Sequence, residues 1–215
     1  MNIRNTTAKE KMLKKIRQAL LQKRDNPHLD FEDSALYKDE EESLDVTFAR
    51  ELTNIGGKFV YCDGEISVIE NLIGLVEELG VTKIYAWEPA VQVLLKHYGF
   101  PYFATDKDFE QAEVGITACE ALIARNGSVM LSNAGGAGRR LSIYPPVHIV
   151  LAKASQLVMD IRHGIAQIKD RYPTYLPSMI TTITGPSRTA DIEKKLVLGA
   201  HGPKELYVFL IEDRF

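Results

Sequence analysis

Two glycine- and arginine-containing turns hold the residues best suited to binding an anion. The first turn is the sequence NAGGAGRR, residues 133–140. Its glycines leave backbone N–H groups accessible, and its arginines can make bidentate contacts with a phosphate or a carboxylate. The candidate ligand-binding residues in it are Gly135, Gly136, Arg139 and Arg140. Because the sequence that follows, LSIYPPVHIVLA, is extended rather than helical, a flexible loop without a ligand remains an equal alternative.

The second turn follows the β-branched run ITTIT, residues 180–184, which predicts a strand. We expect Gly185-Pro186 to turn the chain into a short helical segment, whose free N–H groups, with Arg188 beside them, favour an anion. The candidate ligand-binding residues are Thr184, Gly185, Ser187 and Arg188. Asp191 and Glu193 place negative charge at the same helix start, so a structural cap without a ligand is equally open.

Acid–base chemistry has two candidates, Glu120 and His148. Glu120 and the candidate ligand-binding residue Thr117 are polar groups in the otherwise apolar segment GITACEA, where a carboxylate can act as a base or a nucleophile. His148, near the start of a predicted strand, can carry a proton because an unperturbed histidine has a pKa of ~6.5. Both have structural alternatives, since strand alternation can point Glu120 at solvent and a lone histidine is more often structural.

Two further residues lie in turns. Asn126, in the sequence ARNG, is a candidate for contact with a ligand through its backbone, although Asn-Gly is also a common tight turn because both residues tolerate positive φ. His201, in the sequence AHGP, is a ligand-binding candidate if it faces Ser187 and Arg188, and otherwise a turn residue.

The elements that must position these residues alternate between strands and helices. The predicted strands are residues 58–62, 83–87, 115–124, 128–132, 147–152, 180–184 and 205–211, and the predicted helices are residues 44–54, 65–79, 89–98 and 155–168. The Asn126-Gly127 turn predicts a strand hairpin or a strand-turn-strand over residues 115–124 and 128–132. This alternation predicts an α/β fold with a mostly parallel sheet flanked by helices, whose ligands bind beyond the carboxyl ends of the strands. The loops CDGEIS and AWEPA reach that edge and can line a cleft.

An N-terminal arm precedes this domain. Apolar residues recur at helical spacing within residues 7–24, which predicts an amphipathic helix with a lysine-rich outer face, and an acidic linker follows in residues 25–42. We therefore divide the chain into an N-terminal helical arm, residues 1–42, and an α/β domain, residues 43–215. The helix either packs on its own domain or docks a partner.

Composition narrows the function. A chain of 215 residues with a net charge of −3 has no overall attraction for nucleic acid. Cys62 and Cys119 lie far apart and form no C-x-x-C, so the sequence encodes no zinc site and no self-contained iron–sulfur site. No glycine fingerprint for a dinucleotide follows any strand, and we expect no bound cofactor. The chain has no signal-peptide core and no long uncharged apolar run, so we expect a soluble cytoplasmic protein without a membrane contact.

The C-terminal half resembles a known family. The sequence TGPSRTADIE followed by VLGAHGPKELYVFLIED, together with GITACEALIARNGSVMLSNAGGAGRRLSIYPPVHIVLA, is similar to the LUD-domain proteins of the lactate utilization protein C group. The resemblance implies a fold similar to the CoA-transferase, ribose-phosphate isomerase and glucosamine-phosphate deaminase group. It also implies a role in bacterial conversion of L-lactate to pyruvate. The sequence ARNG departs from the family pattern AETG, which weakens the transfer of a catalytic carboxylate to Arg125.

Three functions follow as hypotheses. The leading one is a lactate utilization protein that acts with iron–sulfur partner proteins in L-lactate oxidation and binds a small carboxylate or phosphorylated ligand between the two turns. The second is a stand-alone enzyme, a CoA transferase or a sugar-phosphate isomerase, which would depend on Glu120. The third is a non-catalytic scaffold that docks a partner through its basic N-terminal helix.

Overall fold

The structure is a computed structural model that describes residues 7–21, 42–192 and 195–213. It forms two compact units, Met1–Asp39 and Glu40–Phe215. In the first unit, helix α1 (Ala8–Leu21) confirms the predicted amphipathic helix, and its residues are exposed. Residues 22–24 of that prediction and the predicted linker up to residue 41 lie outside the described residues. The division of the chain at residue 42 stays a prediction.

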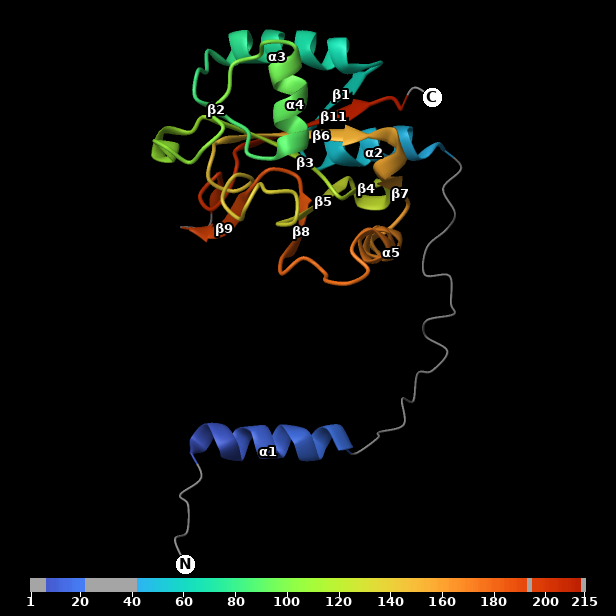
Figure 1. The fold of residues 1–215 in the computed structure, drawn as a ribbon, viewed down its shortest axis with the longest axis vertical. Coiled ribbons are helices and arrows are strands. Elements are labelled where there is room, and N and C mark those ends of the chain that lie inside the picture. The colour runs from blue at the N-terminus through green and yellow to red at the C-terminus, as the bar shows by residue number, and fades with distance from the viewer. Residues whose placement is uncertain (1–6, 22–41, 193–194, 214–215) are drawn as a thin grey trace, which may run out of the picture. The chain divides into compact units, whose positions relative to one another are not determined.

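The second unit is built on a five-stranded parallel sheet (Figure 1). Its strands, in spatial order, are β1 (Lys58–Cys62), β11 (Glu205–Ile211), β6 (Val147–Lys153), β3 (Val114–Ala118) and β2 (Ile84–Tyr85), and every neighbouring pair is parallel. The predicted α/β class with a mostly parallel sheet is confirmed. β2 is shorter than the predicted strand at residues 83–87.

Helices α3 (Glu65–Leu79) and α4 (Pro89–His97) cover one face of this sheet (Figure 1). Val68, Leu72 and Leu75 of α3 lie on one side of the helix because 3.6 residues complete a turn, and all three are buried against the sheet. α3 ends where Gly80 takes φ 64°, a left-handed conformation that glycine adopts at little cost.

The other face packs against helix α2 (Leu44–Asn54) and a second, four-stranded sheet. That sheet has the order β7 (Leu157–Val158), β4 (Ala121–Ile123), β5 (Ser128–Ser132) and β8 (Ile180–Thr184). The antiparallel pair β4–β5, joined through the short 3-10 turn Ala124–Asn126, confirms the predicted hairpin. Helix α5 (Ile161–Arg171) covers the far side of this sheet (Figure 1). Glu120 lies between β3 and β4, and the glycine-rich turn lies between β5 and β6. Both are therefore at points where the chain passes from one sheet to the other.

One predicted helix begins later than expected, and another is a strand. The helix expected at residues 155–168 begins only at Ile161, because the Asp160 carboxylate accepts a hydrogen bond from the Arg162 N–H at the helix start. Upstream, Leu157 and Val158 pair with β4 instead. The short helix expected after Gly185-Pro186 is strand β9 (Arg188–Ile192), which forms an antiparallel hairpin with β10 (Lys195–Leu198).

Candidate functional site

Glu120 lies where the chain passes from one sheet to the other. Sequence alternation predicted one strand over residues 115–124, but the run divides into β3 and β4, which belong to different sheets. Cys119 and Glu120 form the junction, at the carboxyl end of β3. The Glu120 N–H donates to the Met130 carbonyl over 2.8 Å, which ties the junction to β5. The residue therefore sits at the sheet edge where ligands of parallel sheets bind.

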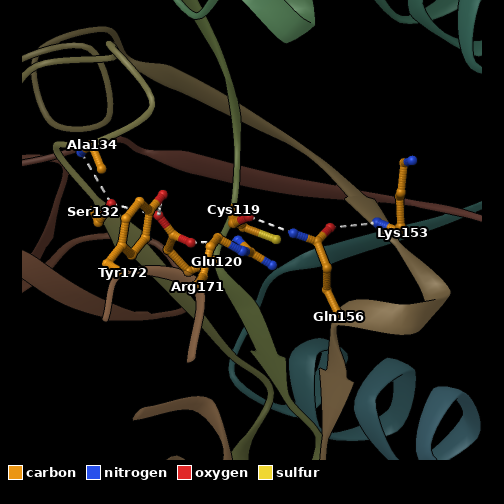
Figure 2. Close-up of polar contacts among 8 residues, drawn as sticks. All are labelled: Cys119, Glu120, Ser132, Ala134, Lys153, Gln156, Arg171 and Tyr172. Atoms are coloured by element: carbon orange, nitrogen blue, oxygen red, sulfur yellow. Dashed lines mark hydrogen bonds and ion pairs between the residues drawn. The ribbon is translucent and has the colours of Figure 1, made fainter. Parts of the chain in front are cut away.

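Three donors from two distant parts of the chain hold the Glu120 carboxylate, which is 5% exposed. The Ser132 hydroxyl donates to Oε1 over 2.5 Å, and the Tyr172 hydroxyl donates to the same oxygen over 3.0 Å. Arg171 forms an ion pair with Oε2. Figure 2 shows these three side chains converging on the carboxylate. Glu120 does not point at solvent, and its negative charge has a cation beside it.

Ser132 also contacts the glycine-rich turn, and the Glu120 charge affects the pKa of Tyr172. The Ser132 oxygen accepts a hydrogen bond from the Ala134 N–H over 3.1 Å, so the first residues of the turn are fixed to the carboxylate (Figure 2). Burial raises the pKa of the Tyr172 hydroxyl, and its hydrogen bond to Glu120 raises it further. Tyr172 therefore stays protonated as a donor to Glu120.

A second buried carboxyl group, Glu88, faces the same turn. It follows β2 in the AWEPA loop, is 6% exposed, and its Oε2 accepts a hydrogen bond from the Ala118 N–H at the end of β3. Its Oε1 lies so close to Gly135 that a Cβ there would stand 2.6 Å from the oxygen. Burial raises the pKa of Glu88 and the charge of Glu120 adds to the rise, against the Ala118 hydrogen bond, which lowers it.

Cys119 is buried near both carboxyl groups, and its carbonyl takes part in a hydrogen-bonded link between two strands. Burial raises the pKa of its thiol strongly, and the charges of Glu88 and Glu120 act in the same direction. A thiol in these surroundings is a poor nucleophile. The Cys119 carbonyl accepts a hydrogen bond from the Gln156 side chain, whose oxygen accepts from the Lys153 N–H over 2.7 Å (Figure 2). Gln156 thus joins the carboxyl ends of β3 and β6.

The arginines of the glycine-rich turn point to different partners. Arg139 donates to the Ser178 hydroxyl over 3.3 Å, and Asn133 donates to the same hydroxyl over 2.9 Å. Arg140 pairs with Asp106 at 3.2 Å, and its guanidinium lies 5.3 Å from the centre of the Phe109 ring. Arg139 is therefore linked to Asn133, the residue after Ser132, through the Ser178 hydroxyl that both contact, whereas Arg140 contacts Asp106 and Phe109.

The second predicted anion turn lies at the other end of the same strand pair. Ser132, which precedes the glycine-rich turn, pairs with Ile180, whereas Ser128 pairs with Thr184. Four residues along a strand span about 14 Å, so the two turns do not share a cleft at their strand ends. The Gly185 and Arg188 region instead packs on the end of α2: a Cβ on Gly185 would meet the Ile55 carbonyl oxygen at 2.7 Å.

The remaining contacts of that second turn are structural. Arg188 donates to the Ile55 carbonyl, and the Thr184 hydroxyl pairs with the Ser128 hydroxyl over 2.7 Å. The Ser187 N–H donates to the Pro203 carbonyl over 2.8 Å, which links the turn to the AHGP segment. His201 of that segment is exposed. Since no helix begins here, the geometry lacks the free helix N–H groups that suggested an anion site.

His148 and Thr117 form a separate buried pair. The His148 Nε2 lies 2.9 Å from the Thr117 hydroxyl, and the histidine has no exposed surface. Burial lowers the pKa of His148 to about 3, so the ring stays neutral in the folded protein near neutral pH. Its Nδ1 has no hydrogen-bond partner among the described residues. The pair therefore packs between strands rather than carrying protons at neutral pH.

The Asn126-Gly127 turn serves packing. Asn126 is exposed, and Gly127 takes φ 63° against α2, where a Cβ would stand 2.3 Å from the Leu52 nitrogen. Only glycine fits this close backbone approach.

The structure adds residues that the sequence did not single out. Ser132, Arg171 and Tyr172 contact Glu120, and Glu88 faces it across the junction. Glu88 lies in a loop expected to line a cleft, which was the one sequence signal for it. The contacts of Arg171 and Tyr172 span 51 and 52 residues of sequence, and no local pattern reports them.

A surface hollow of about 890 Å³ lies at the start of α3, away from these residues. Its charged lining is Asp63, Glu65 and Glu70, which repels an anion. We therefore place the candidate site at the Glu120 cluster, where basic, acidic and hydroxyl groups meet.

Among the described residues, no group of three His, Cys, Asp or Glu side chains is placed to hold a metal ion. Within the same residues, no helix combines the length and apolar character needed to cross a membrane.

Comparison with known proteins finds relatives of one kind. The chain is 33% identical over 138 residues to the lactate utilization protein C of Bacillus licheniformis, a match covering 62% of this chain and 52% of the relative. It is 38% identical over 110 residues to lactate utilization protein C of Bacillus subtilis, covering 50% and 46% of the two chains. The protein of that name from Bacillus velezensis is 40% identical over 107 residues, covering 49% and 44%. The chain thus spans about half the length of the curated relatives it matches.

The fold has a solved counterpart. The crystal structure of a DUF162 family protein from Deinococcus radiodurans matches with a TM-score of 0.56 at 17% identity, over 78% of this chain and 96% of that chain. A likeness at this identity concerns the fold alone. The family model of the LUD domain matches residues 47–211. Because that match includes the two sheets, the Glu120 junction and the glycine-rich turn, the chain belongs to the LUD domain family.

Proposed function

We propose that this protein acts in L-lactate utilization and that its Glu120 cluster binds a small carboxylate or phosphorylated ligand. The name of the relatives, lactate utilization protein C, supports the role. The matched segments cover only about half of those proteins, so their whole activity is carried over here as a proposal. The cytoplasmic location expected from the sequence stays a prediction.

The observation that carries the proposal is the arrangement around Glu120. A buried carboxylate, an arginine and two hydroxyl groups meet at the carboxyl edge of the parallel sheet, beside an exposed glycine-rich turn. Polar groups that converge at such an edge mark ligand sites in α/β proteins. The Arg171 side chain is 45% exposed, so part of its guanidinium is open to a ligand while it pairs with Glu120.

We assign the oxidation itself to iron–sulfur partner proteins. Cys62 and Cys119 are both buried, and they lie in different parts of the fold rather than in a common cluster. An iron–sulfur cluster needs several thiolates at one point. In this proposal the chain binds or positions the carboxylate, and a partner takes up the electrons.

The stand-alone enzyme remains the alternative. A CoA transferase of this fold would need a carboxylate oxygen free to attack a thioester. Glu120 has both oxygens engaged by donors, which argues against it in that role. The non-catalytic scaffold depends on α1, whose exposed apolar and basic residues leave docking to a partner as a prediction.

The test is growth of a bacterial host on L-lactate after deletion of the gene, with glucose as the control carbon source. We expect the deletion to abolish growth on L-lactate and the wild-type gene to restore it. A gene carrying Arg171→Ala should restore growth poorly, and one carrying Arg162→Ala, an exposed arginine on the same helix, should restore it fully. Normal growth of the deletion strain on L-lactate, in a host without a second copy, would refute the role.

Affinity purification from cells grown on L-lactate tests the partners. Iron-containing proteins should purify with the wild-type chain. Their absence, together with turnover of CoA thioesters or sugar phosphates by the chain alone, would favour the stand-alone enzyme.

A further inference from the structure

Glu88, the second buried carboxyl group near the glycine-rich turn, has different contacts from Glu120. One oxygen is held by a single backbone donor, the Ala118 N–H. The other oxygen, Oε1, accepts no hydrogen bond from the residues that the structure describes. This oxygen faces Gly135 of the glycine-rich turn, where a Cβ would stand 2.6 Å from it. This oxygen is available to a ligand at the glycine-rich turn.

Burial favours the protonated form of Glu88 and raises its pKa, and the charge of Glu120 adds to the rise. The titratable groups that act on it or are affected by it are Glu120 and Cys119, and neither supplies a positive charge. Arg171 is engaged by Glu120. Glu88 thus keeps its proton to a higher pH than an ordinary glutamic acid, and a protonated carboxyl group has one O–H donor.

We propose that Glu88, in its protonated form, donates a hydrogen bond to a small carboxylate bound at the glycine-rich turn. The inference rests on the proposed function, since it names the chemical class of ligand for the same site. Arg171 balances the charge of Glu120, so a protonated Glu88 adds no negative charge to the site. Ionisation of Glu88 adds a negative charge beside the ligand and removes the O–H donor.

The glycine-rich turn suits this geometry. A side chain at position 135 would collide with the Glu88 oxygen, so the absence of a Cβ lets the turn approach Oε1. Gly136 takes φ 96° and Gly138 φ 68°, which other residues adopt only under strain. The exposed backbone of this turn supplies further N–H donors to an anion.

Calorimetric titration of the purified full-length protein with L-lactate and with pyruvate tests the inference, from about pH 5.5 to about pH 8.5, where both ligands stay ionised. The variants are Glu88→Gln, which keeps an N–H donor without a charge, and Glu88→Ala, which removes the donor. Glu70→Gln is the matched control, because it removes an exposed carboxylate on α3, which follows β1 at the opposite edge of the sheet from β2 and Glu88. Urea unfolding of each variant establishes that it is folded at each pH.

We expect wild-type affinity to fall as the pH rises, because ionised Glu88 repels the ligand. Glu88→Gln should bind with a smaller pH dependence, and Glu88→Ala should bind about tenfold or more weakly at the lower pH, the effect of one lost hydrogen bond to a charged group. Glu70→Gln should follow the wild type.

The inference would be overturned by pH-independent wild-type binding, or by a Glu88→Gln variant that is folded and binds as weakly as Glu88→Ala. Absence of binding to either carboxylate would also overturn it, and normal rescue of growth on L-lactate would then leave the proposed function standing. The reverse pattern, carboxylate binding without any growth phenotype, would sustain the inference and refute the proposed function.

Discussion

The buried neutral His148 should make the protein lose stability in acid. The pKa of this histidine falls from 6.5 to about 3 on burial. Below pH 6.5 the unfolded chain therefore binds a proton that the folded protein excludes, so the free energy of unfolding falls as the pH falls from 6.5 towards 3. A shift of this size corresponds to about 5 kcal/mol in total, of which about 3 kcal/mol is lost between pH 7 and pH 4.

His148→Gln isolates this contribution, because a glutamine amide can still meet the Thr117 hydroxyl and does not titrate. Urea unfolding at pH 7 and at pH 4 gives the free energy of unfolding of both proteins, with comparable slopes as the condition for comparison. We expect the wild type to lose about 3 kcal/mol more than the variant between the two pH values. Other carboxyl groups titrate in this range too, but they contribute equally to both proteins and cancel in the difference.

His163→Gln is the control, since His163 is exposed on α5 and the substitution removes a histidine that solvent reaches in the folded protein. It should leave the pH dependence of the wild type unchanged. If wild type and His148→Gln lose stability in parallel, the neutral buried state assigned to His148 is wrong. A pH titration of the histidine ring by NMR would show the same directly, as a ring that stays neutral well below pH 6.

Two further predictions concern packing and the Glu120 cluster. Gly127→Ala should destabilise the protein by about 3 kcal/mol or more, and Gly80→Ala by only about 1 kcal/mol. Both glycines have positive φ, but only a Cβ at position 127 would collide with Leu52. Equal losses of stability in urea unfolding would contradict the clash. Glu120→Ala should cost about 2–3 kcal/mol, below the full cost of breaking a buried ion pair because Arg171 is half-exposed; a loss under about 0.5 kcal/mol, the usual size for a surface site, would show that the cluster does not hold the junction.

The sequence was informative wherever structure depends on neighbouring residues. Apolar spacing and a terminal glycine located α3 and its end at Gly80, and Asn126-Gly127 located the β4–β5 hairpin. Helix periodicity and turn chemistry act within a few residues, so one segment contains the whole signal. The same local rules failed after Gly185, because pairing of β9 with β10 decided the outcome and a strand partner is not written in the segment itself.

The candidate site was predicted only in part for the same reason. Glu120 and the glycine-rich turn stood out as polar or flexible residues in apolar surroundings. The run of residues 115–124 gave no sign of its division, because the apolar alternation continues across Cys119 and Glu120 while the two halves join different sheets. The donors to Glu120 come from 12 to 52 residues away, which only the tertiary fold can bring together.

The two buried carboxyl groups differ in what holds them, and this difference divides their roles. Glu120 is fixed by Ser132, Tyr172 and Arg171, so moving it would disturb β5, α5 and the crossing between the sheets. Among the described residues, the Ala118 backbone amide holds one oxygen of Glu88, and no hydrogen bond is made to the other. A ligand bound at the turn would therefore lie near a Glu120 whose charge is paired with Arg171, and near a Glu88 that can gain or lose a proton. The pH dependence of ligand affinity should therefore depend on Glu88, and the free energy of unfolding should depend on Glu120.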